Sequence, residues 1–324
     1  MSEEREFLIE TVRDLVTKHA DPEAVRAAMA SDRGYDEKLW QLLCEQVGVA
    51  ALVVPEELGG AGGELADAAA VIGELGRALV PTPLLGTTLA ELALLAGDAP
   101  DAEALEQLAA GAVIGTVVFD PDYVLGGDVA EIIIAVKGGA LERWTGFDSE
   151  TLPTVDSTRR LAKVQPTDTA AAGTDPGLAD IALLLLAAEQ IGAATRCLEL
   201  TVAYTKERVQ FGRAIGSFQA LKHRMADLYV KVQTAGAVVD EVVQNWASDP
   251  SPANAALAHV MATEAFRDVA GEAIQLHGGI AITAESDIQL YFKRAHGSSQ
   301  LLITPQEALR TLESEIFSDA AAAT

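Results

Sequence analysis

The feature that most constrains this fold is a set of three long apolar-periodic segments in the second half of the chain. They run from about Leu178 to Glu207, from Ser217 to Ala247 and from Ala253 to Gln275. Apolar side chains recur in them at the three- and four-residue spacing of amphipathic helices. A short fourth helix is expected from about Ser286 to Ala295, and Thr304 to Glu307 reads as a capping box that begins another helix. Antiparallel helices of this length predict a four-helix bundle.

The chain before the bundle changes periodicity once. Residues 3 to about 111 show helical spacing, interrupted by a loop with Pro55 and four glycines. Segments 113–119, 131–136 and 140–147 alternate like short strands, and we expect a further strand pair within 154–164. The predicted fold is mainly α with a small central β domain. Its parts are an N-terminal helical domain at 1–111, a reduced middle β domain at 112–170 and a C-terminal four-helix bundle at 171–324.

Charge and composition exclude several classes of partner. The formal net charge is −25, with 23 Lys and Arg against 48 Asp and Glu, so a polyphosphate surface such as nucleic acid is not expected. The longest apolar run, Ile181 to Ala188, is too short to span a bilayer, and the first residues lack a signal-peptide pattern. Cys44 and Cys197 lie in separate helical patterns and are expected to be buried, reduced thiols. We expect a cytoplasmic protein without a membrane or metal partner.

One basic turn stands out in this acidic chain. It contains Arg208, Arg213, Lys222, His223 and Arg224. Local positive charge of this kind is typical of an anion site, and phosphate is the obvious candidate. The alternative is a solvated basic turn between two core helices.

Three motifs in order along the chain resemble the acyl-CoA dehydrogenase family. Val54-Pro-Glu-Glu-Leu-Gly-Gly60 is similar to the family's Pro-Glu-(Glu/Lys)-x-Gly-Gly element. Tyr204-Thr-Lys-Glu-Arg-Val-Gln-Phe-Gly212 is similar to its Tyr-x-x-x-Arg-x-x-Phe-Gly element, and Gln275-Leu-His-Gly-Gly279 to its Gln-x-x-Gly-Gly element. The resemblance covers almost the whole chain and implies an acyl-CoA dehydrogenase-like fold. In that family the last two elements bind FAD across a subunit interface.

The resemblance implies FAD-binding roles for five residues: Arg208, Phe211, Gln275, Gly278 and Gly279. Arg208 would contact the flavin pyrophosphate and Phe211 would pack near the adenine and ribose. Arginine suits this role because its charge-assisted hydrogen bonds to phosphate are strong, and a glycine pair lets backbone approach closely. In the alternative interpretation Phe211 is a core residue, the glycines only end a helix, and Arg208 pairs with Glu207 or Glu199.

The carboxylate that removes the substrate's α proton in most family members is missing from this sequence. The family uses such a base while the flavin accepts the β hydride, and a positioned base contributes about 10²–10⁴ in rate. The resemblance places Leu302 at the usual Glu position and Ala182 at the other known location. Glu189 is only a weak candidate. We therefore assign no catalytic residue.

A polar segment follows the short fourth helix and contains His296, Ser298 and Ser299. By resemblance it would face the active site and line the substrate. The alternative, which we favour on sequence alone, is an ordinary polar turn after Gly297.

The middle β segment also departs from the family. It has about half the usual length and lacks the segments that hold the flavin ring and the thioester, although Asp156-Ser-Thr-Arg-Arg160 resembles the family's Asp-x-Thr-Arg stretch. The chain thus keeps the part of the FAD site offered to a neighbour and lacks the part it would use itself. The implied protein is one subunit of an α2β2 FAD-dependent acyl-CoA dehydrogenase whose full-length partner supplies the ring pocket and the base.

Two-gene enzymes of this kind act on steroid side-chain CoA thioesters in actinobacteria, so the resemblance implies an acyl-CoA substrate and an electron-transfer acceptor. Two other interpretations stay open. One is a self-sufficient homo-oligomeric dehydrogenase with a non-standard base such as Glu189. The other is a flavin-free scaffold subunit that keeps the bundle only for assembly.

Overall fold

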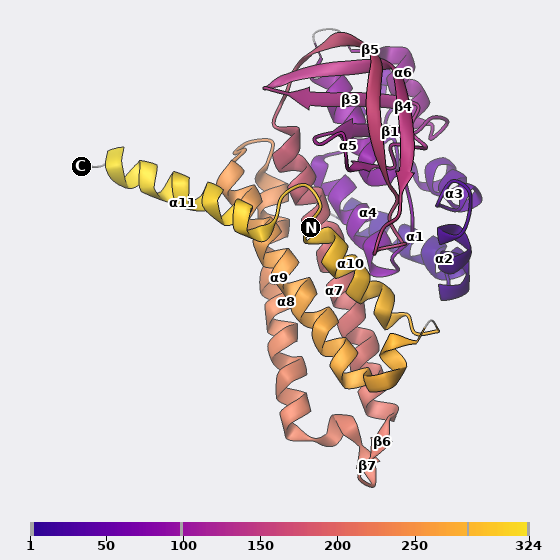
Figure 1. Cartoon of the computed structure of the whole chain (residues 1–324), viewed down its shortest axis with the longest axis vertical. Coiled ribbons are helices and arrows are strands. Elements are labelled where there is room, and N and C mark those ends of the chain that lie inside the picture. The colour runs from indigo at the N-terminus through magenta and orange to yellow at the C-terminus, as the bar shows by residue number, and fades with distance from the viewer. Residues whose placement is uncertain (1–2, 98–99, 284, 323–324) are drawn as a thin grey trace.

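A computed structural model shows helices at both ends of the chain and one small sheet between them (Figure 1). The structure describes residues 3–97, 100–283 and 285–322, of which 315–322 only as backbone. The predicted fold class, mainly α with a small sheet, is confirmed.

Among the described residues, six helices and one 3₁₀ turn precede the sheet. Three of the helices begin after an aspartate, Asp21, Asp36 or Asp101, whose carboxylate accepts hydrogen bonds from backbone N–H groups of the first turn. The elements are α1 (Glu3–His19), α2 (Pro22–Met29), α3 (Glu37–Val47), η1 (Glu56–Leu58), α4 (Leu65–Arg77), α5 (Leu84–Leu95) and α6 (Ala102–Ala109).

The loop after α3 folds back on itself, as its glycines predict. A Cβ built at Gly60 would lie 1.9 Å from the backbone oxygen of Val54. Only glycine allows this approach, so the Pro-Glu-Glu-Leu-Gly-Gly motif has a structural reason in its own right. The buried Cys44 on α3 is a free thiol, as expected, and burial raises its pKa to about 12.

The sheet has five strands in the order β1-β3-β4-β5-β2, in which only β1 and β3 are parallel. They are β1 (Gly115–Val118), β2 (Val124–Leu125), β3 (Ile132–Lys137), β4 (Ala140–Leu152) and β5 (Leu161–Thr174). The expectation of a strand pair within 154–164 is wrong, because residues 153–160 form a loop and β5 begins at Leu161. Strand β5 then continues to Thr174 through pairing with β4.

One edge of this sheet is open. Strand β5 pairs with β2 only at Leu161 and Ala162, and from 165 to 172 no strand lies along its outer edge in the described part of the chain. Pro166 protects that edge, because it lacks the N–H donor that a further strand would use.

The second half of the chain forms the predicted bundle. Helix α7 has the bounds expected from the sequence, and α10 begins two residues later and ends three residues later than predicted. The capping box is confirmed, since the Thr304 N–H donates to Glu307 Oε2 at 2.8 Å. The elements are α7 (Leu178–Glu207), η2 (Ile215–Ser217), α8 (Gln219–Asn245), α9 (Pro252–His277), η3 (Gly278–Ile282), α10 (Ile288–Ser298) and α11 (Pro305–Ala322).

Helix α7 connects the N-terminal part of the molecule to the bundle through its contacts. By length and composition alone it could cross a membrane, but 61% of its most apolar window is buried inside the protein, which is the environment of a core helix. Its buried face contacts α4 of the N-terminal part as well as α8 and α9 of the bundle. At the crossing with α4, a Cβ built at Gly192 would lie 1.9 Å from the backbone oxygen of Gly73. The backbones of α4 and α7 therefore pack closely at this crossing, and a side chain at position 192 would force them apart.

Candidate functional site

The C-terminal ends of α7 and α9 meet at one end of the bundle. The ring of Tyr204 stacks on that of His277 with centroids 4.1 Å apart, and the Tyr204 hydroxyl donates to the His277 carbonyl at 3.4 Å. Arg208 directly follows α7, and Gly278 directly follows α9. This contact therefore brings the two predicted FAD-binding motifs to the same end of the molecule, at the bottom of Figure 1.

Arg208 leads into a short hairpin at that end. Strands β6 (Val209–Gln210) and β7 (Arg213–Ala214) pair antiparallel, joined by Phe211 and Gly212. Both joining residues have positive φ, 54° and 77°, which matches the type I′ turn of a two-residue hairpin. Asn or Gly is preferred at such positions, and an aromatic residue there is strained.

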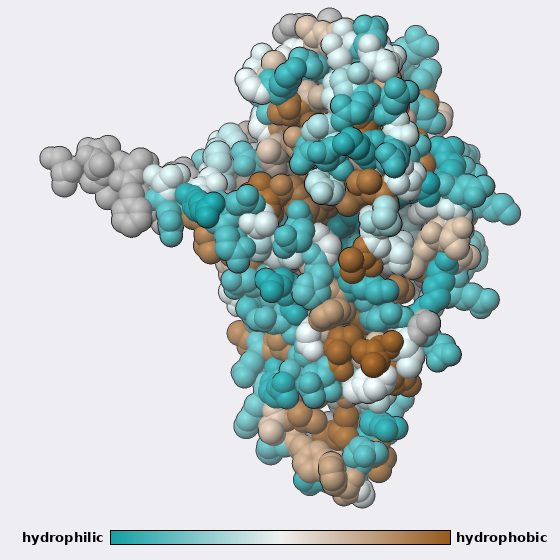
Figure 2. Space-filling view, viewed as in Figure 1, coloured by the Kyte–Doolittle hydropathy of each residue, from teal (hydrophilic) through white to brown (hydrophobic). Residues whose placement is uncertain are grey.

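The strained residue is also exposed. Phe211 is 91% exposed, and its ring lies in a T-shaped arrangement with the Phe218 ring, 6.2 Å away between centroids. Figure 2 shows apolar side chains at this lower end of the molecule, where the hairpin lies. The interpretation of Phe211 as a core residue is therefore wrong. Nothing inside the described chain explains a strained aromatic ring that faces water.

Arg208 is exposed and makes no ion pair within the described residues. Glu199, one of its expected alternative partners, instead pairs with Arg77 at 2.9 Å and with Arg196 at 3.2 Å. The guanidinium of Arg208 is thus available for an anion outside this chain.

The glycine pair presents open backbone beside these groups. Gly278 has φ 64° and ψ −144°, a conformation that a side chain opposes. A Cβ built at Gly278 or Gly279 would meet nothing within 4 Å, so packing inside the chain does not require glycine at these positions. Gln275, one turn earlier, is exposed as well. A free cation, an exposed ring and accessible backbone fit the phosphates and base of a dinucleotide. We call these five residues, Arg208, Phe211, Gln275, Gly278 and Gly279, the bundle-end site.

A second candidate site lies at the opposite end of α7. A cavity of about 640 Å³ opens where α5, β1, the loop at 152–156 and the segment after α10 come together. We call it the interdomain cavity. Leu302, at the position where the resemblance expects a glutamate, lies in its wall with a strained φ of 69°.

The polar segment at the end of α10 also belongs to this cavity. His296, Gly297 and Ser299 line it, whereas Ser298 is fully buried and accepts a hydrogen bond from Arg159 at 3.0 Å. Ser298 therefore ends α10 and Ser299 lies in the turn that follows, but both are buried, so this turn is not the solvated one that the polar residues suggested.

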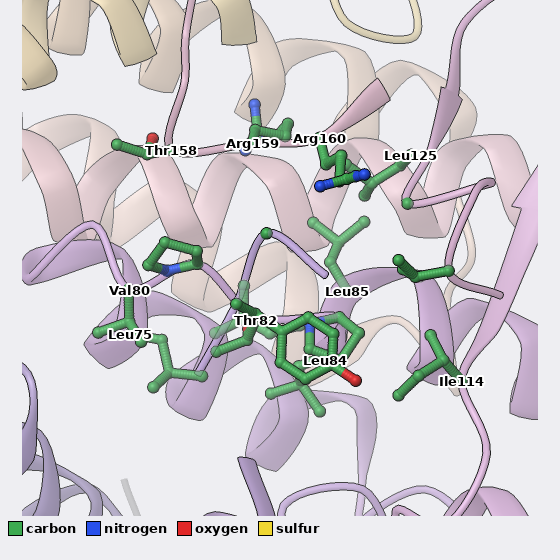
Figure 3. A pocket seen from close by; sticks show the side chains of 18 of the residues that line it. Leu75, Val80, Thr82, Leu84, Leu85, Ile114, Leu125, Thr158, Arg159 and Arg160 are labelled. Atoms are coloured by element: carbon green, nitrogen blue, oxygen red, sulfur yellow. The ribbon is translucent and has the colours of Figure 1, made fainter. Parts of the chain in front are cut away.

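A buried cluster of charges joins the cavity to the bundle. Arg294 of α10 pairs with Glu189 of α7 and with Asp156 of the β4–β5 loop, each at 2.8 Å, and Arg159 pairs with Glu189 from the same loop. In Figure 3 the side chains of Arg159 and Arg160 leave this loop in different directions, opposite a wall of apolar residues that includes Leu84 and Leu85.

The cluster favours the charged forms of Glu189 and Arg294. Burial opposes ionisation of Glu189, but Arg159 and Arg294 outweigh it and lower the pKa of this carboxyl below its ordinary value. Burial likewise opposes the charge of Arg294, yet Asp156 and Glu189 raise its pKa. Two cations and two carboxylates compensate one another here. No sequence pattern predicted this cluster, although Asp156 to Arg160 was recognised as a family stretch.

Comparison with known proteins gives consistent matches over this structure. Residues 2–112 match the family described as acyl-CoA dehydrogenase, N-terminal domain, and residues 182–300 match acyl-CoA dehydrogenase, C-terminal domain. Acyl-CoA dehydrogenase IpdE2 of Mycobacterium tuberculosis is 66% identical over 97% of this chain and 98% of its own length. Acyl-CoA dehydrogenase FadE34 of the same organism is 34% identical over 78% of this chain but only 38% of its own length.

Two solved structures share the fold closely. One is described as a Tcur3481-Tcur3483 steroid ACAD, with a TM-score of 0.91 and 26% identity over 98% of this chain and 99% of that chain. The other is the ChsE4-ChsE5 complex from Mycobacterium tuberculosis, with a TM-score of 0.89 and 24% identity over 98% of both chains.

Proposed function

Because this chain belongs to the acyl-CoA dehydrogenase family, whose members use FAD, we propose that it is a subunit of a heteromeric FAD-dependent acyl-CoA dehydrogenase. It supplies the pyrophosphate and adenine half of the FAD site to a catalytic partner. The observation that carries the proposal is the bundle-end site, where Arg208 and Phe211 face away from their own chain. Arg208 and Phe211 would then contact a ligand that is bound by another subunit.

Each residue of the bundle-end site has a definite task. When bound, FAD supplies the acceptor for the hydride that leaves the β carbon of the acyl thioester. Arg208 donates charge-assisted hydrogen bonds to phosphate, and Gln275 can donate without adding charge. The Phe211 ring packs against the adenine end, where an aromatic face covers apolar area. Gly278 and Gly279 let backbone approach the pyrophosphate.

Proton removal is assigned to the partner. Leu302 has no group that accepts a proton. Glu189 is held by Arg159 and Arg294, and its lowered pKa makes it a weak base. Glu189 therefore serves to anchor the β4–β5 loop and α10 to α7.

The relatives support a proposal for the partner and the substrate. The two similar solved structures are described by pairs of gene products, and this chain covers one chain of each almost completely. One of them is described as a steroid ACAD. We infer a full-length partner subunit in an α2β2 assembly, an acyl-CoA substrate with a steroid-derived acyl group, and an electron-transfer acceptor that reoxidises the flavin.

A second function is favoured by one observation. The interdomain cavity is open, which would suit a self-sufficient homo-oligomeric dehydrogenase that uses Glu189. That enzyme would first have to release Glu189 from both arginines. A flavin-free scaffold is disfavoured, because it would have no use for an exposed and strained Phe211.

Flavin content after co-purification separates these functions. The chain is expressed alone and together with its full-length partner, and flavin absorbance and mass are measured. We expect a colourless chain alone and a yellow complex with about one flavin for every two chains, because two-fold symmetry would repeat the one complete kind of site twice among the four chains of an α2β2 assembly. A yellow homo-oligomer with one flavin per chain would contradict the proposal. So would a colourless complex.

Phe211→Asn should change stability and flavin binding in opposite directions. Asparagine tolerates positive φ, so the isolated chain should gain up to about 1 kcal/mol in its free energy of unfolding. The complex should lose flavin more readily, because the ring against the adenine end is gone. Urea unfolding and flavin retention on gel filtration measure the two effects. The control is Phe7→Asn, a helical and 71% exposed phenylalanine at which neither change is expected.

A further inference from the structure

We propose that the interdomain cavity is a ligand site of this chain in its own right, for a bulky apolar molecule that carries an oxygen acceptor and no phosphate. The site is separate from the bundle-end site. Leu186 lines the cavity and Arg208 follows the far end of the same helix, which places them about 33 Å apart along α7 at 1.5 Å per residue.

The size and walls of the cavity suit a large hydrocarbon body. Its volume of about 640 Å³ lies within the range of small-molecule sites. The inner wall is apolar and comes from three elements: Leu85 and Leu89 of α5, Leu186 of α7, and Leu301 and Leu302 after α10. At the mouth, Tyr123 and Val155 are 62% and 71% exposed. A ligand that fills the cavity would cover apolar surface that water now reaches.

One buried cation supplies the polar contact. The side chain of Arg159 is only 7% exposed and lines the cavity. It uses Nη2 for Glu189 and Nη1 for Ser298 Oγ among the described residues, and a guanidinium has five N–H groups. N–H groups therefore remain for a carboxylate or carbonyl oxygen of a ligand. Fixed in place by its partners, Arg159 would orient that oxygen without a loss of side-chain entropy.

The charges around the cavity argue against a coenzyme A ester as the occupant. Its acidic and basic lining residues are Arg159, His296, Asp120 and Asp156, and no lysine is among the described residues that line it. Asp156 is already paired with Arg294. A phosphate-bearing ligand would find little positive charge here, in a protein of net charge −25. A free hydrocarbon acid or ketone fits better.

Calorimetric titration of the full chain tests this proposal. The probe is deoxycholate below its micelle concentration, a rigid hydrocarbon body with a carboxylate. We expect saturable binding of about one molecule per chain, with affinity reduced about tenfold or more in Val155→Asp, because a charge then stands at the apolar mouth. Phe7→Asp is the matched control, equally exposed at 71% but away from the cavity, and should bind like the unaltered chain.

Two further measurements complete the test. Coenzyme A alone should show no saturable heat. Arg159→Gln should weaken deoxycholate binding, with helicity checked by circular dichroism because Arg159 also holds Glu189; if this variant does not fold, Val155→Asp still decides. The proposal is overturned if the unaltered chain does not bind deoxycholate saturably, if Val155→Asp and Phe7→Asp bind equally well, or if coenzyme A alone binds with equal affinity.

Discussion

Arg208→Glu should strip flavin from the heteromeric complex while the chain itself stays folded. The arginine is exposed and without an ion pair among the described residues, so its replacement costs this chain little stability. At the phosphate it removes a charge-assisted contact of about 1.5–3 kcal/mol and adds repulsion. We therefore expect flavin affinity to fall by about a hundredfold or more.

Flavin retained after gel filtration and the dissociation constant for added FAD measure this effect. The matched control is Lys206→Glu, which makes the same change in net charge two residues earlier, on the last turn of α7. It should keep most of its flavin. Equal losses in both variants would point to the general electric field instead of a contact with phosphate, and retention in Arg208→Glu would remove Arg208 from the site.

Arg294→Met should be the most destabilising of the single changes described. Arg294 holds both Glu189 and Asp156 in a buried setting, and its removal leaves carboxylates without their full compensation. Breaking one partner of a buried ion pair typically costs about 3–5 kcal/mol. The free energy of unfolding in urea should fall by that amount, and the β4–β5 loop should lose its attachment to the bundle.

A surface arginine provides the comparison for this change. Arg196→Met removes an ion pair with Glu199 in which both side chains are nearly half exposed, and should cost less than about 1 kcal/mol. At acid pH the stability losses of Arg294→Met and Arg196→Met should become more similar. The pKa of Glu189 is lowered in the folded state, so its contribution is present above the ordinary glutamate pKa of about 4.3 and is lost as the pH falls below it. Similar losses of unfolding free energy in both variants would show that the buried ion pairs stabilise the fold no more than a surface ion pair does.

Local signals explain why much of the fold could be predicted. Helix α7 starts after Gly177, which has a φ of 92°, and ends shortly before the turn at Gly212, so a glycine in the sequence lies close to each limit. Strand β5 was missed beyond Val164 because residues 165–174 are small and polar, and alanines 170 to 172 have low strand propensity. Its conformation comes from pairing with β4, which lies earlier in the chain.

The same distinction applies to the candidate sites. The bundle-end residues could be named because each motif is continuous in the sequence. The sequence did not show that Phe211 is strained and exposed, because that depends on how the hairpin projects from the bundle. The charge cluster joins Glu189 to residues 30 and 105 positions away, Arg159 and Arg294, and no periodicity connects such distances. The interdomain cavity likewise forms only where α5, β1, the β4–β5 loop and the segment after α10 come together.

The outer edge of β5 bears on how the proposed heteromeric assembly would form. An unprotected strand edge would let newly made copies stack on one another before a partner arrives. Pro166 opposes such stacking, because it offers no N–H donor at this edge. In the proposed heteromer, this subunit could therefore remain unpaired until its partner is made, and the two subunits would not have to be synthesised in strict balance.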